Sequence, residues 1–387
     1  MTTVERFTPV RRQGYRVMPL ELFFDLVFVL AVTQCTGFMG RDPTWAGVGE
    51  GLLLLGILWW SWVGYAWLTS VVDPEEGAVR LVLVAAMAGV LVAALAIPDA
   101  FGDLGLTFAI AYGCVRASHI ALFTLASRDE PDFRSSVVGL GVGTAIGVGL
   151  LIGGAMFDSE GTRVAFWSIA LLLDMAEPYF FGADGWRLEP THFVERHGLV
   201  IIVALGESVV AIGVGASHGV DARVIVAAVA AMTMIAGLWW TYFDVVSTVA
   251  ARRLIAATEG RERNELARDA YSYLHFPLIA GIVLAAFGLE ATIAHVDESL
   301  EVVPAVALGG GTALYLLGHV AFARRSFGAL KVHRVLAALA ALVVIPIGTE
   351  VDAVVTVVLV AAILSALVTY ETFRYAEARQ QIRHEVS

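Results

Sequence analysis

Ionisable side chains within apolar segments are the residues of this sequence best suited to do chemistry. A charged group that faces lipid costs about 2.5–3.5 kcal/mol on insertion scales, so such residues turn inward and form functional or structural networks. The candidates for proton or ligand binding are Glu21, Asp25, Arg116, His119, Asp174, Glu177, Glu195, His197, Glu207, Asp244, His275 and His319. We expect an acid-rich cluster towards the cytoplasmic side.

The acids of this set outnumber the permanent cations. Coulomb repulsion in a low dielectric would not leave five carboxylates ionised beside one cation, Arg116, without compensation. Either some are protonated or a bound cation lies among them, as in the relays of transporters. The alternative is a structural network in which Arg116 and the histidines satisfy the acids. The five are Asp25, Asp174, Glu177, Glu207 and Asp244.

Simpler structural roles are open for several candidates. Glu21, two residues after Pro19, would complement a helix N-terminus, and Asp25 follows one turn deeper on the same face. Glu195 and Arg196 would lie merely at the membrane interface. Each histidine taken alone would make a structural hydrogen bond. Five glycines between Gly139 and Gly149 would let helices pack closely in lipid.

Other kinds of site are not indicated. The sequence has no H-E-x-x-H or H-x-x-E-H run and no G-x-S-x-G motif, so we expect neither a metal site nor a nucleophile elbow. Cys35 and Cys114 form no C-x-x-C pair. No cofactor is identified, and the absence of a basic stripe argues against nucleic acid as a partner.

The elements that must position these residues are membrane helices. Of 387 residues, 58% are hydrophobic and 16% charged, and the mean hydropathy is +0.77. Only a lipid environment tolerates so apolar a surface, because lipid requires backbone hydrogen bonds to be satisfied internally. We therefore predict an all-α polytopic bundle of about twelve spans. These lie at 20–39, 46–70, 77–98, 104–127, 135–156, 163–182, 194–217, 222–250, 270–294, 302–325, 330–349 and 351–375.

The basic residues set the orientation. With the N-terminus in the cytoplasm, 21 of the 25 Lys and Arg residues fall on the cytoplasmic side. Arg41, Arg163 and Arg223 fall outside, and Arg116 lies within a span. This distribution follows the positive-inside rule, so we expect both termini in the cytoplasm.

Four short sequence matches suggest that the second half of the chain repeats the first. They occur in the same order in both halves, at offsets from 174 to 200 residues. We expect parallel six-helix repeats over 1–190 and 191–387 in one integrated membrane domain. The matches pair Glu21 with Glu195, Trp59–Trp62 with Trp239–Tyr242, Ala88–Leu91 with Ala280–Val283, and His119–Leu122 with His319–Phe322.

Three segments resemble the bacterial low-temperature-requirement A proteins over nearly the whole chain. The first is Glu21–Val29, read as Glu-Leu-Phe-Phe-Asp-Leu-Val-Phe-Val; the others are Glu195–Ser208 and Trp239–Asp244. The resemblance implies a multi-pass bacterial inner-membrane protein named for growth in the cold, and it implies no activity. It supports the candidates Glu21, Asp25, Glu195, His197, Glu207 and Asp244.

Two functions remain open. The first is a proton- or cation-coupled secondary transporter, with a polar cavity between its halves and Asp25, Asp174 and Glu207 carrying protons. Arg116 would pair with one of these acids or with an anionic substrate. The second is a membrane-embedded enzyme that acts on a lipid or isoprenoid through a buried carboxylic acid. The expected partners are the lipid bilayer, an unidentified solute or lipid, and a second copy of the chain in a homo-oligomer.

Overall fold

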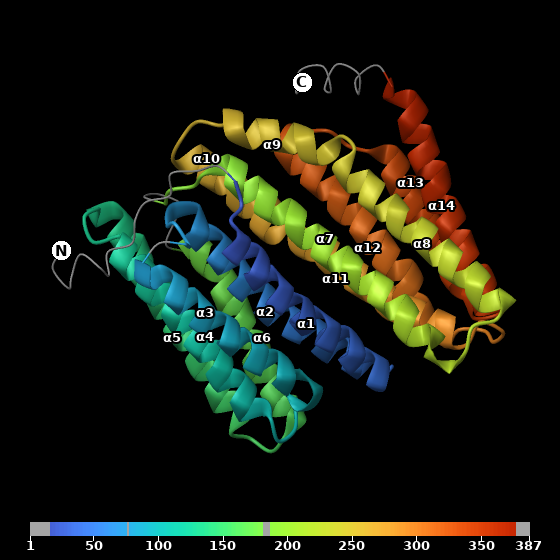
Figure 1. The fold of residues 1–387 in the computed structure, drawn as a ribbon, viewed down its shortest axis with the longest axis horizontal. Helices are drawn as coiled ribbons and strands as arrows, with labels where there is room; N and C mark the ends of the chain where they lie inside the picture. Colours follow the sequence, from blue (N-terminus) through green and yellow to red (C-terminus); the bar gives the residue numbers. More distant parts are fainter. Residues whose placement is uncertain (1–15, 76, 181–185, 377–387) are drawn as a thin grey trace. The chain divides into compact units, whose positions relative to one another are not determined.

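The structure is a computed structural model that describes residues 16–75, 77–180 and 186–376. Within these ranges every regular element is a helix (Figure 1). The chain divides into two compact units, Met1–Val200 with Leu254–Ser272 and Ile201–Arg253 with Tyr273–Ser387. Each unit is treated by itself below.

The first unit is built around one buried helix, α2, which packs against α1, α4 and α6. Large side chains of α2, including Trp59, Trp62 and Tyr65, are at most 1% exposed. Any polar group that faces α2 is therefore shielded from lipid. The long helices of this unit are α1 (Pro19–Arg41), α2 (Trp45–Val71), α3 (Gly77–Ala96), α4 (Gly105–Ala126), α5 (Pro131–Ala155) and α6 (Glu160–Phe180).

Three further segments complete the first unit. They are the start of α7 (Pro190–Gly215), the short helix α10 (Arg261–Leu266) with the stretch from Leu254 that precedes it, and most of a π-helix at Ala267–Tyr273. A π-helix forms hydrogen bonds between residues five apart instead of four, and such turns occur frequently at functional sites. This segment returns to the first unit from far along the sequence.

The second unit consists of the remainder of α7 with α8 (Ala222–Phe243), most of α9 (Val246–Ala256), α11 (His275–Ala294), α12 (Val302–Phe327), α13 (Val332–Gly348) and α14 (Ala353–Arg374). Successive helices α11 to α14 pack on one another, and α8 packs on α14. A buried ion pair joins α13 to α14: Arg334 donates to both carboxylate oxygens of Glu371 over 2.7 and 2.8 Å.

The predicted helical membrane bundle is confirmed. Ten helices in the described ranges are long and apolar enough to cross a bilayer. Of the twelve expected spans, the two outside this set correspond to α6 and α13. Helix α6 carries Glu160, Arg163, Asp174 and Glu177 within 21 residues, and α13 has 17 residues. The cytoplasmic orientation of the termini and the parallel repeat stay predictions.

Candidate functional site

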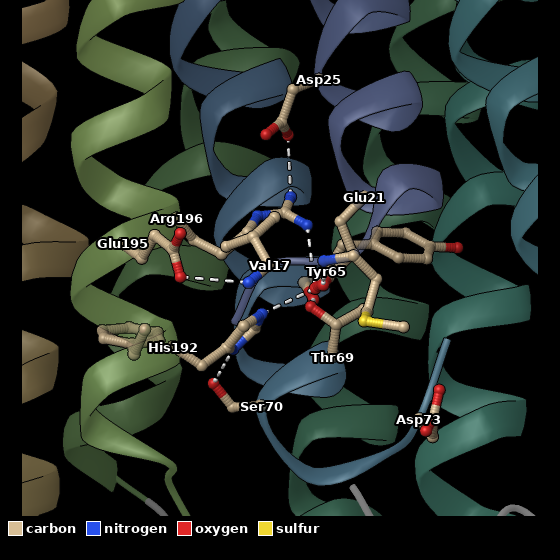
Figure 2. Close-up of polar contacts among 12 residues, drawn as sticks. Val17, Glu21, Asp25, Tyr65, Thr69, Ser70, Asp73, His192, Glu195 and Arg196 are labelled. Atoms are coloured by element: carbon tan, nitrogen blue, oxygen red, sulfur yellow. Dashed lines mark hydrogen bonds and ion pairs between the residues drawn. The ribbon is translucent and has the colours of Figure 1, made fainter. Parts of the chain in front are cut away.

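Glu21 and Asp25 on α1 face His192 and Arg196 on α7 (Figure 2). Arg196 donates from Nη1 to Glu21 Oε1 over 3.1 Å and from Nη2 to Asp25 Oδ1 over 2.8 Å. His192 Nε2 lies 2.8 Å from the same Glu21 oxygen. All four side chains are at most 3% exposed. We call these four residues the α1–α7 cluster.

Helix α2 completes the α1–α7 cluster. The indole Nε1 of Trp62 donates to Asp25 Oδ1 over 2.9 Å, and its ring lies 5.5 Å from the Arg196 guanidinium. Ser70 Oγ is 3.2 Å from His192 Nδ1. The second oxygen of Asp25, Oδ2, is buried and makes no hydrogen bond with any described residue. Asp25 Oδ1 thus accepts both hydrogen bonds, one from Arg196 and one from Trp62.

Glu21 both caps the start of α1 and belongs to the α1–α7 cluster. Its Oε2 accepts the Met18 backbone N–H over 2.9 Å, which caps the start of α1 at Pro19. Its Oε1 receives Arg196 and His192. Glu195, by contrast, is exposed and accepts the Val17 backbone N–H over 3.0 Å. Of the two acids, Glu21 is the one held among buried charges.

A second cluster lies between α4, α5 and α6. Arg116 donates from Nη2 to Thr144 Oγ1 over 2.7 Å, and the same nitrogen is 3.6 Å from Asp174 Oδ2. Tyr112 donates to that carboxylate oxygen over 3.4 Å. Glu177 follows Asp174 by one turn of α6 and is 6% exposed. We call Arg116, His119, Asp174 and Glu177 the α4–α6 cluster.

Glycines of α5 make room for both acids of the α4–α6 cluster. A Cβ at Gly143 would lie 2.9 Å from Glu177 Cγ, and one at Gly147 would lie 3.0 Å from Asp174 Oδ1. Both distances are below ordinary van der Waals contact, so a larger residue would force the Glu177 or Asp174 side chain to shift. The close-packing interpretation of the glycine stripe is confirmed at these two positions.

His119 packs against α2 at the edge of the α4–α6 cluster. Its ring lies 5.4 Å from the Tyr65 ring and 4.9 Å from the Phe123 ring. A Cβ at Gly64 would approach His119 Nε2 to 3.0 Å, so this glycine admits the imidazole. The histidine is 1% exposed. It is therefore fixed by aromatic packing.

The two clusters contain the same set of groups. Each has two carboxylates, one arginine and one histidine, all buried. With both acids ionised and the histidine neutral, each cluster carries a net charge of −1. A proton or a monovalent cation would neutralise either cluster. Because charge is costly to hold in a low dielectric, this deficit favours uptake of one positive charge.

A cavity of about 80 Å³ adjoins the α4–α6 cluster inside the first unit. One probe-sized water occupies about 10–15 Å³ on this measure, so the cavity has room for several waters or a small solute. Its walls include the aromatic side chains Trp60, Trp67, Phe123 and Trp186. The polar residues that line it are Arg116, His119, Glu177, Asn264, Arg268 and Ser272.

The π-helix and α10 supply one side of this cavity. Asn264, Arg268 and Ser272 are spaced four residues apart and all line it. Ser272 Oγ accepts the indole N–H of Trp67 over 3.0 Å. Arg268 donates to Asp269 Oδ1 over 2.8 Å and to the Pro178 carbonyl over 3.4 Å. These bonds tie the π-helix to α2 and α6.

Three other candidates sit in structural surroundings. His197 Nδ1 is 2.8 Å from the Phe193 carbonyl, and its ring packs edge-on against Trp62 at 5.1 Å. In the second unit, His275 Nε2 is 2.9 Å from the Tyr242 hydroxyl. His319 lies against the same tyrosine, with ring centroids 5.6 Å apart.

The two remaining acids, Glu207 and Asp244, also belong to the second unit. Glu207 on α7 is 2% exposed, and Asp244 is half-buried at the end of α8. The expected convergence of these acids with those of the first unit stays a prediction. The acids of the first unit lie in two clusters.

The expectation of one buried cation, Arg116, is wrong. Arg196 is 1% exposed and serves Glu21 and Asp25, although its place near a predicted span end suggested an interfacial position. In the second unit Arg334 is 2% exposed. The physical reason is that an arginine near a helix end is buried when a neighbouring helix places carboxylates within ion-pair distance of it.

Sequence reasoning also missed His192, Arg268 and the tryptophans of the cavity. A signal existed for the first: His192 and Arg196 are four residues apart, as are Glu21 and Asp25. Two helices that each carry a pair at this spacing can match acids to bases on facing surfaces. No such pattern marks Arg268, which reaches the cavity from a π-helix. Among the described residues, no group of three or more His, Cys, Asp or Glu could hold a metal ion.

Comparison with known proteins places the chain in a family. The model of the bacterial low temperature requirement A protein family matches residues 16–369. An uncharacterized protein of Rhizobium meliloti (strain 1021) is 30% identical over 311 residues, which cover 77% of this chain and 75% of that protein. No solved structure matches the chain. The chain is thus a member of the bacterial low temperature requirement A protein family.

Proposed function

We propose that this membrane protein is a proton- or cation-coupled secondary transporter of a small solute in the bacterial inner membrane. In this proposal both termini lie in the cytoplasm, and the second six-helix half repeats the first. The solute enters the cavity beside the α4–α6 cluster. A proton or cation binds in the same cluster and couples to it.

The charge of the α4–α6 cluster is the observation that supports this proposal. Two buried carboxylates, Asp174 and Glu177, share one arginine beside a cavity large enough for a solute. A group that binds and releases one positive charge next to a solute site is what coupling requires. Intramembrane acids that face a cavity serve as proton relays in pumps and transporters.

Glu177 is the residue best placed to exchange the coupling charge. Asp174 lies 3.6 Å from Arg116 and accepts a hydrogen bond from Tyr112, whereas Glu177 makes no hydrogen bond or close salt bridge with any described residue and interacts with Arg116 only at longer range. Its side chain lines the cavity. Asp25 and Glu21 share Arg196 in the other cluster and do not line this cavity. We therefore assign the exchange of the proton or cation at the cavity to Glu177.

Proteoliposomes that contain a trapped pH-sensitive dye test the proposal. The purified protein is given a panel of labelled solutes (monocarboxylates, amino acids, ammonium ions and neutral alcohols) with and without a pH gradient. We expect at least one class to move together with a change of internal pH. Glu177→Gln should abolish the coupled proton movement. Glu265→Gln, at a partly exposed residue of α10 in an ion pair with Arg261, should leave it unchanged.

Two results would count against transport. If folded protein moves no solute and no proton across the whole panel, the proposal fails. If the lipids of the same vesicles are chemically altered while nothing is transported, the membrane-embedded enzyme is supported instead. Lipid extracts analysed by mass spectrometry at the end of each assay distinguish these results.

A further inference from the structure

The cavity of the first unit combines aromatic walls with one carboxylate that has no counter-ion of its own. Trp60, Trp67, Phe123 and Trp186 line it together with Glu177. Aromatic faces attract cations through the ring quadrupole, and cages of such rings recognise alkylammonium groups. The walls therefore suit an apolar cation better than a strongly hydrated metal ion.

The arginines of the cavity do not oppose this preference, because each is matched by an acid. Arg116 lies 3.6 Å from Asp174, and Arg268 lies 2.8 Å from Asp269. The Arg268 guanidinium also stacks over the Tyr179 ring at 4.0 Å. Asp174 and Asp269 do not line the cavity, but they balance the two arginines that do, so the charge left over is the −1 of Glu177. An anion would add to a site that already carries excess negative charge.

The volume limits the size of the occupant. The cavity measures about 80 Å³, which is room for roughly five to eight probe-sized waters at about 10–15 Å³ each. An ammonium ion with one to four methyl groups is of a suitable size, whereas a long-chain or polycyclic amine is too large. Asn264 and Ser272 add polar groups at one wall.

We propose that this cavity binds a small alkylammonium ion, whose positive charge pairs with Glu177 and whose methyl groups contact the tryptophan faces. The inference rests on the proposed function, because it names the solute class that would exchange with the coupling proton. Cation and proton compete for the same carboxylate. Transport by this site is then an exchange of the ammonium ion against a proton.

Tetramethylammonium chloride is the probe, measured by isothermal titration calorimetry on the full chain in lipid nanodiscs. The neutral tert-butanol and the anionic pivalate have similar branched shapes and serve as charge controls. We expect tetramethylammonium to bind and the two controls not to bind. Binding of pivalate in preference to the cation, or of none of the three, would overturn the inference.

The pH dependence of binding tests the competition. Charged and titratable groups around Glu177 are Arg116 and His119 on α4, Asp174 on α6 and Arg268 on the π-helix, while α5 presents glycine. If one proton leaves for each cation bound, affinity falls by up to about tenfold per pH unit as the acid becomes protonated. An affinity independent of pH contradicts competition at Glu177.

Variants separate the charge from the aromatic wall. Glu177→Gln should weaken tetramethylammonium binding by about 10- to 100-fold, as expected for the loss of an interaction with a charged partner. Glu265→Gln is the matched control and should bind as the native chain does. Trp186→Leu should weaken binding about 3- to 30-fold, and Trp186→Phe should restore most of it by keeping a π face. Unchanged affinity in both Glu177→Gln and Trp186→Leu refutes the site.

The inference and the proposed function fail separately. Coupled movement of another solute class in the vesicles, without tetramethylammonium binding, refutes the cation site and leaves coupled transport standing. Tetramethylammonium binding that depends on Glu177, without any transport, leaves the cation site standing and refutes the transporter.

Discussion

Replacement of Arg196 by leucine tests whether the α1–α7 cluster depends on its single arginine. The guanidinium makes hydrogen bonds of 3.1 and 2.8 Å to two carboxylates that are both buried. Hydrogen bonds to charged groups contribute about 1.5–3 kcal/mol each. Removal of one partner from a buried ion pair typically costs about 3–5 kcal/mol, because the remaining charge is left buried. We expect Arg196→Leu to lower the free energy of unfolding by about this amount.

The assay is unfolding of the purified protein in mixed micelles of increasing SDS fraction, followed by far-ultraviolet circular dichroism. Arg187→Leu is the matched control, because Arg187 forms an ion pair with Glu130 while 54% exposed, and such pairs contribute about 0–1 kcal/mol. A triple variant, with Arg196→Leu, Glu21→Gln and Asp25→Asn, removes the stranded charges and should recover much of the loss.

The reasoning is refuted by either of two outcomes. If Arg196→Leu unfolds at the same SDS fraction as Arg187→Leu, the buried pair does not stabilise the fold. If the triple variant is less stable than the single one, the loss does not come from uncompensated carboxylates. In that case the contact of the guanidinium with the Trp62 ring would be the larger contribution.

Two further predictions concern packing and a second ion pair, and the same unfolding assay measures both. Gly143→Val should destabilise the fold by about 1–3 kcal/mol, because its Cβ would lie 2.9 Å from Glu177 Cγ, whereas Gly149→Val, with no atom within 4 Å, should cost little; equal losses would show that helix propensity dominates. Arg334→Lys should cost about 1–2 kcal/mol, because lysine cannot reproduce the two-point contact with Glu371; an unchanged stability would contradict the role of that geometry.

The membrane fold was predictable because its cause is local. A run of about 20 apolar residues must form a helix in lipid whatever its neighbours are, since no other partner exists for its backbone. Helix α1 illustrates this: Pro19 and Glu21 mark its start in the sequence, and the structure begins the helix there. Helix α6 is harder to predict as a membrane span, because Asp174 and Glu177, which belong to the α4–α6 cluster, lower its hydropathy.

The candidate acids of the first unit were also visible in the sequence, because an ionisable residue stands out in an apolar helix. The pairs Glu21 with Asp25 and Asp174 with Glu177 each lie on one helix face, as the spacing requires. The spacing does not indicate which basic residue pairs with each acid. Arg196 lies near the end of a predicted span and Arg116 lies within one, yet each pairs with acids of another helix.

The sequence by itself determined the helical membrane class and the buried positions that carry charge, because hydropathy and residue type are properties of short segments. Only the tertiary structure decided that Arg196 pairs with both acids of α1, and that a π-helix brings Arg268 and Ser272 to the same cavity as Glu177. The physical reason is the distance along the chain over which each effect acts. A hydrophobic run acts within one helix, whereas the balance of charge in a cavity depends on helices that are far apart in the chain and meet only when the unit is packed.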